Sequence, residues 1–60
     1  MSFQEEISNI KTLLQEIEED LPKVEKGVKK AARRVRKNLS GISKACKAAR
    51  KLALEEAQSE

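Results

Sequence analysis

The sequence predicts an all-α protein that forms a single domain over residues 1–60. Apolar residues recur at steps of three and four through most of the chain, and only two glycines and one proline are available to end helices. Charged residues make up 38% of the sequence and fill the positions between the apolar ones. An apolar seam with this period, flanked by charges, is typical of helices that pack as in a coiled coil.

The first helix is expected over residues 2–39. Ser2 is followed three residues later by Glu5, the spacing of a capping box, so Ser2 is the expected N-cap. The apolar seam then continues in strict alternation of four-residue and three-residue steps. It comprises Phe3, Ile7, Ile10, Leu14, Ile17, Leu21, Val24, Val28, Ala31 and Val35. All of these except Ala31 are expected to mediate self-association.

Pro22 leaves two arrangements open. A proline inside a helix costs about 3 kcal/mol, because it lacks an N–H and its ring clashes with the preceding turn. Proline also suits the first turn of a new helix, which would give a three-helix bundle broken at Pro22 and Gly41. Leu21 and Val24 keep the seam in phase across Pro22. This continuity favours one long helix, kinked at Pro22.

The second helix is expected over residues 42–57. The seam slips out of phase at Leu39, and Ser40 and Gly41 follow at once. Glycine suits the left-handed position just beyond a helix end, so the helical hairpin is expected to turn at Gly41. Cys46 falls on the apolar stripe of this second helix and is expected to be a small buried core residue.

The net charge of +3 conceals a strong segregation of charge. Residues 1–22 carry one lysine against six carboxylates (−5), residues 23–51 carry twelve cations against one carboxylate (+11), and residues 52–60 carry three carboxylates (−3). Antiparallel packing places the acidic part of one chain beside the basic part of another, whereas parallel packing aligns like charges. We therefore expect an antiparallel homodimer that pairs through residues 3–35.

Composition argues against catalysis and metal binding. The sequence has no histidine, no tyrosine and a single cysteine, and it lacks a glycine-rich phosphate loop. We expect no enzymatic activity, no small-molecule substrate, no cofactor and no metal site. The sequence also lacks the long apolar run that a transmembrane helix requires.

The basic middle of the chain is the candidate binding site. Phosphate binding needs positive charge alone, whereas base readout needs side chains fixed in a groove, often Asn or Gln. The cations here are dispersed and only Asn38 lies among them, so the expected partner is double-stranded DNA bound without sequence preference. The predicted contacts are Lys26, Lys29, Lys30, Arg33, Arg34, Arg36, Lys37, Lys44, Lys47, Arg50 and Lys51.

Two other functions fit the same residues. In the first, the chain is a helical oligomerisation or protein-interaction module, and its basic segment only neutralises an acidic partner helix. In the second, an amphipathic helix lies on an anionic membrane surface.

Residues 13–56 resemble the N-terminal part of the chlamydial linker-histone-like nucleoid protein family. The resemblance rests on a Leu-Leu pair, an Asp-Leu pair, the segment KVEKG, the segment AARRVR and the spaced lysines that follow. These motifs begin at Leu13, Asp20, Lys23, Ala31 and Lys44. The block from residue 23 to residue 36 is the most specific part.

The resemblance implies a cytoplasmic bacterial protein that binds and compacts DNA in the nucleoid. It also implies that this region of the family mediates self-association. The Lys/Ala-rich tail of the family, regarded as its main DNA-binding element, has no counterpart in the sixty residues, so we expect the helical region to supply the basic surface.

Overall fold

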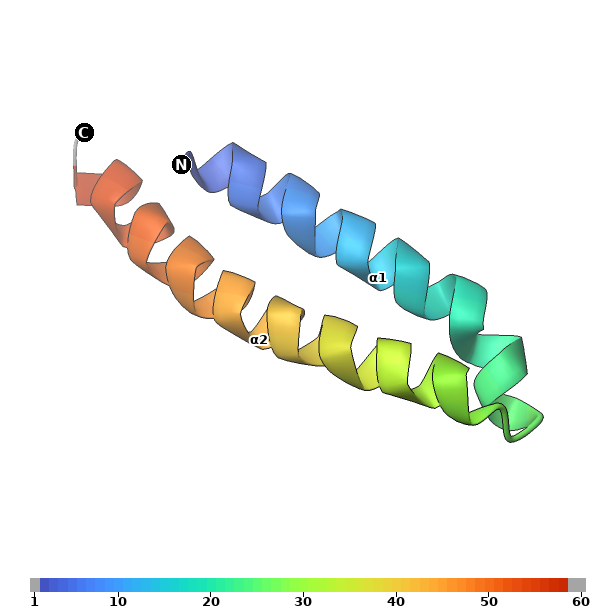
Figure 1. Ribbon diagram of the computed structural model, residues 1–60. Coiled ribbons are helices and arrows are strands. Elements are labelled where there is room, and N and C mark those ends of the chain that lie inside the picture. The colour runs from blue at the N-terminus through green and yellow to red at the C-terminus, as the bar shows by residue number, and fades with distance from the viewer. Residues whose placement is uncertain (1, 59–60) are drawn as a thin grey trace.

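The computed structural model describes residues 2–58, which form an antiparallel hairpin of two helices. Helix α1 spans Phe3–Glu25 and helix α2 spans Lys29–Gln58, and residues 26–28 connect them. The two helices lie side by side along the length of α1, and α2, the longer helix, extends beyond the start of α1 at the end opposite the turn (Figure 1). The molecule is a rod of 49 × 14 × 14 Å. The prediction of an all-α helical hairpin is confirmed.

Helix α1 begins and continues as its sequence predicts. The backbone N–H of Glu5 donates to the Ser2 side-chain oxygen over 3.1 Å, so Ser2 is the N-cap. The helix passes through Pro22, which lies in its last turn. There the missing N–H costs a single hydrogen bond at an exposed position. The three-helix alternative, with a break at Pro22, is therefore wrong.

The chain reverses at Gly27, and the predicted break at Gly41 is wrong. Gly27 has φ +85°, the left-handed conformation that glycine adopts at low cost. The Gly27 N–H donates to the Val24 carbonyl over 2.9 Å, and the Val28 N–H donates to the Lys23 carbonyl over 3.0 Å. This pair of bonds is a Schellman motif, which satisfies the last carbonyls of α1. The helices expected over 2–39 and 42–57 are therefore replaced by α1 and α2.

Gly41 lies inside α2, where it allows close packing. A Cβ atom placed on Gly41 would lie 3.3 Å from the Cδ1 atom of Leu13 in α1. The helices can therefore approach each other closely at this level. Leu39, where the predicted seam slips out of phase, is exposed, and the buried and half-buried residues of α2 continue from Val35 through Asn38 to Ile42 without a slip.

The reversal at Gly27 divides the predicted seam. One part faces the interior of the hairpin, where Ile17 is 8% exposed and Phe3, Ile10 and Val24 are half-buried. The alternate members of the seam are less covered, and three of them are 41–47% exposed: Leu14, Leu21 and Val28. Residues 3–35 therefore do not form the single continuous helix that the predicted dimer requires, because the chain reverses between α1 and α2. Helix α2 of the same chain covers part of the seam.

The core between the helices is thin. Besides Ile17, the buried apolar residues are the alanines Ala31, Ala45 and Ala49, and no large side chain among residues 2–58 is fully buried. Cys46 is exposed, so its predicted place in the core is wrong. The preceding residue, Ala45, occupies that place, because the stripe of α2 that faces α1 passes from Ile42 to Ala49 through Ala45, by a step of three residues and then one of four.

Candidate nucleic-acid interface

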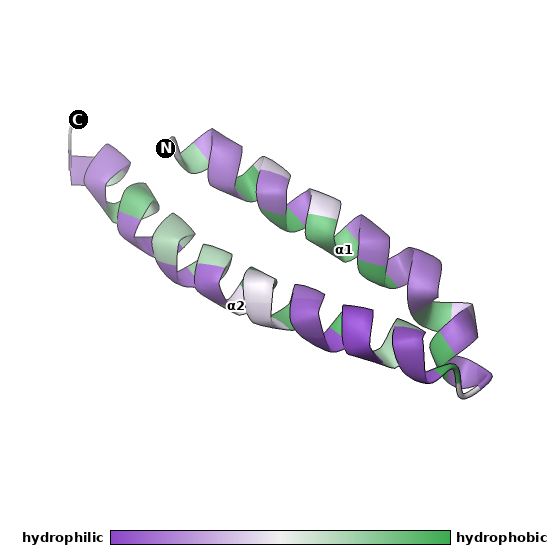
Figure 2. Ribbon diagram, in the orientation of Figure 1, coloured by the Kyte–Doolittle hydropathy of each residue, from purple (hydrophilic) through white to green (hydrophobic). Residues whose placement is uncertain are grey.

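The predicted phosphate-binding residues gather on α2. Lys26 lies in the turn and the other ten lie on α2, whereas α1 carries two lysines against seven carboxylates, a net charge of −5. With ten cations against two carboxylates, α2 has a net charge of +8. All eleven predicted side chains are exposed. The half of α2 next to the turn is the most hydrophilic part of that helix (Figure 2).

Six of these cations form a row along the side of α2 that faces away from α1. Three of them come two residues after a buried alanine. Two residues correspond to a rotation of about 200° around the helix axis, so these cations lie on the side opposite the buried alanines. Starting at the turn, the row advances by three or four residues, with Ser40 as its one uncharged step. We call it the outer ridge, and its cations are Lys29, Arg33, Arg36, Lys44, Lys47 and Lys51.

The outer ridge matches the scale of a DNA duplex. At a rise of 1.5 Å per residue, the interval from Lys29 to Lys51 is about 33 Å long. One helical turn of B-DNA is about 34 Å. A duplex lying along α2 therefore presents phosphates to the ridge over about one full turn.

The ends of α2 carry charges that oppose its dipole. Lys29 and Lys30 occupy the first turn, where carboxylates are normally favourable, and Glu55 and Glu56 lie near the last turn. Cations close to the positive end of a helix destabilise it by a few tenths of a kcal/mol each. A phosphate at this end reverses the penalty, because it interacts favourably with both the lysines and the helix N-terminus.

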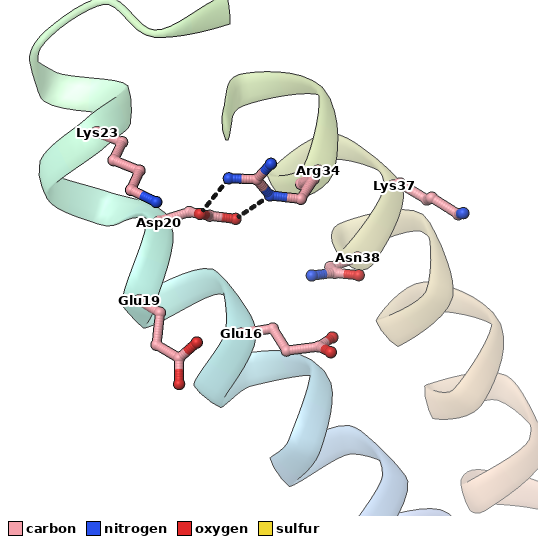
Figure 3. Close-up of a pocket in the computed structure, with 7 residues that line it drawn as sticks. All are labelled: Glu16, Glu19, Asp20, Lys23, Arg34, Lys37 and Asn38. Carbon is pink, nitrogen blue, oxygen red and sulfur yellow. Dashed lines mark hydrogen bonds and ion pairs between the residues drawn. The ribbon is translucent and has the colours of Figure 1, made fainter. Parts of the chain in front are cut away.

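Arg34 is engaged within the chain. Its Nη2 donates to Oδ1 of Asp20 over 2.8 Å and its Nε donates to Oδ2 over 3.1 Å, a two-pronged ion pair that joins the two helices (Figure 3). The hydrogen bonds from Arg34 lower the pKa of Asp20, and those same bonds raise the pKa of Arg34. Arg34 thus fixes the position of α2 against α1, and its charge is largely offset before any ligand arrives.

A groove of about 430 Å³ surrounds this ion pair. Its lining carries charges of both signs in equal number, with Asn38 as the one uncharged member: Glu16, Glu19, Asp20, Lys23, Arg34 and Lys37 (Figure 3). Such a balance suits contacts between the two helices better than the binding of a polyanion. We therefore place the candidate interface on the outer ridge, away from this groove.

Two buried acidic residues were not anticipated from the sequence. Asp20 is 7% exposed and Glu6 is 2% exposed, both on the side of α1 that faces α2. The role of Asp20 depends on the position of the turn: Asp20 and Arg34 lie seven residues before and seven residues after Gly27. A hairpin centred on Gly27 brings them level, so the signal was present in the spacing.

Neither helix is long and apolar enough to cross a membrane, for the residues that the structure describes.

Comparison with known proteins supports the resemblance predicted from residues 13–56. The model of the family described as histone H1-like protein Hc1 matches residues 4–59, almost the whole chain. No curated protein and no solved structure gives a significant match.

Proposed function

The chain belongs to the histone H1-like protein Hc1 family, and from this membership we propose that it is a nucleoid-associated protein that binds double-stranded DNA through the outer ridge. The observation that carries the proposal is the outer ridge itself. It presents six exposed cations along about one turn of a duplex, on the side of the hairpin opposite the acidic helix. The net charge of −5 on α1 repels a duplex, so the approach is directed to α2.

Binding through the outer ridge is independent of base sequence. The ridge contains lysine, arginine and one serine, which suit phosphate oxygens, and it contains no asparagine or glutamine. The sole aromatic residue, Phe3, lies on α1, so stacking on bases has no support from α2. The proposed role is architectural: DNA compaction in a bacterial nucleoid, without recognition of particular sites.

The proposed active form is a homodimer. The hairpin buries one large aliphatic residue and three alanines, a small core for a rod of this length. A domain of about 60 residues is marginally stable, and self-association adds to the apolar surface that it buries. The exposed members of the predicted seam supply the apolar surface for it.

Salt dependence tests the proposed DNA binding. If the six ridge cations each neutralise one phosphate, the logarithm of the binding constant falls with the logarithm of the salt concentration at a slope of about −5. Gel-shift or anisotropy titrations of duplexes of unrelated sequence measure this slope. Affinity that is unchanged between low and high salt contradicts the proposal.

A matched pair of double variants locates the interface. Arg36→Gln with Lys44→Gln removes two charges from the ridge, and Lys11→Gln with Lys23→Gln removes two charges from α1. Glutamine has a helix propensity close to that of lysine and arginine, so both variants keep their helices. We expect the salt dependence of the ridge variant to be less steep by about 2, and that of the α1 variant to be unchanged. Equal effects would mean that overall charge, and no particular surface, attracts DNA.

One observation favours a second function, in which the chain is an interaction module that does not bind DNA. The ion pair between Arg34 and Asp20 shows that at least one cation of α2 neutralises α1. This function predicts no gel shift at physiological salt and a loss of helicity when the ridge cations are replaced.

A further inference from the structure

One edge of the hairpin is apolar and exposed. On α1, Leu14 and Leu21 are 46% and 47% exposed, and on α2, Leu39 is 52% exposed. Val28, in the turn, is 41% exposed and continues the seven-residue spacing of the α1 leucines. Solvent therefore reaches three leucines and a valine on a molecule that buries one large aliphatic side chain among its described residues.

These leucines lie on the same edge of both helices. The ion pair between Asp20 and Arg34 marks the opposite edge. The residue that follows each member of the ion pair is rotated by about 100° around its helix, so it lies beyond the buried stripe, on the other edge. On α1 that residue is Leu21, and on α2 it is Val35, one helical turn before Leu39. We call this surface the apolar edge.

We propose that a second copy of the chain covers the apolar edge, with α1 of each chain lying against α2 of the other, so that the dimer holds two DNA duplexes on opposite sides. The bridging part of this inference rests on the function proposed above, since it takes the outer ridge as the DNA-binding surface. The occupant follows from charge and from self-complementarity: a second hairpin brings an equal apolar edge between an acidic and a basic helix.

Charge selects one of two symmetric arrangements. A two-fold axis parallel to the helices places α1 on α2 of the partner, antiparallel, with both turns at the same end of the bundle. A two-fold axis perpendicular to the helices places α1 on α1 and α2 on α2, with the turns at opposite ends. The first pairs a helix of charge −5 with one of charge +8, whereas the second pairs like charges.

The selected arrangement separates the two outer ridges. Each ridge faces away from α1 of its own chain. When α1 lies on α2 of the partner, the two basic helices occupy diagonal corners of the four-helix bundle, and their ridges point in opposite directions. One duplex binds on each side, and the dimer bridges them. The rejected arrangement places both ridges on one side, where they hold a single duplex.

Spin labels on the turn distinguish the two arrangements. The label is attached at Lys26→Cys in a Cys46→Ser background, because Cys46 is exposed and would also react. With both turns at one end, the labels are about 20 Å apart, as in a bundle whose neighbouring helix axes are 8–10 Å apart. With the turns at opposite ends, the separation approaches the 49 Å length of the rod. The long distance, or the absence of any coupling between labels, overturns the inference.

A matched pair of leucine variants tests the apolar edge. Leu39→Gln removes a side chain from the edge, whereas Leu54→Gln removes a leucine that is 59% exposed and lies beside Lys47 and Lys51, away from the edge. We expect Leu39→Gln to weaken dimerisation about 30-fold, because each dimer loses two leucines, and Leu54→Gln to leave it unchanged. Sedimentation measures the association, and circular dichroism at high concentration checks that the helices persist. Equal effects of the two variants overturn the inference.

Co-capture of DNA tests bridging separately from binding. A biotinylated duplex on beads is incubated with the chain and with a second, untagged duplex, and the untagged DNA retained on the beads is measured. We expect the wild-type chain and Leu54→Gln to retain it, and Leu39→Gln to lose retention while still shifting a single duplex in a gel. A gel shift without co-capture by the wild-type chain overturns the bridging dimer and leaves the proposed DNA binding intact. The absence of a gel shift at low salt refutes both.

Discussion

The two glycines of the chain have opposite roles. Gly27 lies in the turn with φ +85°, and a Cβ placed there would meet nothing within 4 Å. Gly41 lies in the middle of α2 without a positive φ, and a Cβ placed there would lie 3.3 Å from Leu13. The first glycine is required by the backbone and has free space, whereas the second has an ordinary backbone and little free space. A glycine therefore marks a turn only where the backbone conformation demands it.

The turn at Gly27 also sets the register in which Gly41 is useful. Asp20 and Arg34, which pair, lie seven residues before and after Gly27, and Leu13 and Gly41, which pack together, lie fourteen residues before and after it. A turn displaced by one residue would separate both pairs. The close approach at Gly41 thus depends on the conformation of Gly27.

Gly27→Ala gives the largest expected effect of substitution at the two glycines. Because the site has free space, the cost comes from forcing an L-residue into the left-handed conformation, about 1–2 kcal/mol of the free energy of unfolding. Lys26→Ala is the matched control, since Lys26 is the adjacent turn residue with φ −80°. Denaturant unfolding at one protein concentration measures both. Equal stabilities of the two variants would show that the conformation of Gly27 is not what holds the turn.

Gly41→Ala is expected to act in the opposite direction. Alanine stabilises a helix interior by about 1 kcal/mol relative to glycine. The flexible end of Leu13 must shift by a few tenths of an ångström, which consumes part of the gain, so we expect a net increase of about 0.5 kcal/mol. A larger side chain, in Gly41→Leu, would separate the helices and reverse the sign. If Gly41→Leu is also stabilising, α1 does not pack at this level.

The sequence is sufficient for the elements of the fold and insufficient for the position of the turn. The Ser2 cap follows from local chemistry and the passage of α1 through Pro22 follows from the phase of the apolar seam, and both are found. The sequence does not mark Gly27 as a turn, because Val24 and Val28 keep the apolar period unbroken across it. A Schellman turn retains that spacing, so periodicity alone cannot distinguish it from a continuing helix.

In the candidate site, too, some features follow from the local sequence and others depend on how the two helices are placed. The exposure of the eleven predicted cations follows from their charge, and the structure has all of them exposed. The partner of Arg34 depends on the register of the two helices, which the charge of Arg34 does not determine. The division of the apolar seam into a covered and an open part likewise depends on where α2 lies. A seven-residue period identifies apolar positions but does not say which neighbour covers each one.

Acidification gives the smallest expected effect and tests the register that Gly27 sets. Arg34 holds the pKa of Asp20 below its ordinary value, so the folded chain binds fewer protons than the unfolded chain between the two pKa values. The stabilisation is complete when the pH is above the pKa of Asp20 in the unfolded chain, about 4. It is lost as the pH falls through the lower pKa of Asp20 in the folded chain. It is modest, because the Arg34 side chain is 52% exposed and its interaction is screened by water.

The difference in stability between the wild type and Asp20→Asn isolates this contribution from the other carboxylates. We expect the wild type to be the more stable at neutral pH and the difference to shrink as the pH falls below about 4, the pKa of an aspartate in the unfolded chain, toward the lower pKa of Asp20 in the folded chain. Lys37→Gln removes a cation of the same groove while Arg34 keeps its bonds to Asp20, so it serves as the control and should leave the pH dependence unchanged. A difference that is constant with pH would mean that Asp20 does not meet Arg34 in solution. The turn would then lie elsewhere than at Gly27, because the register centred on that glycine is what brings the two side chains level.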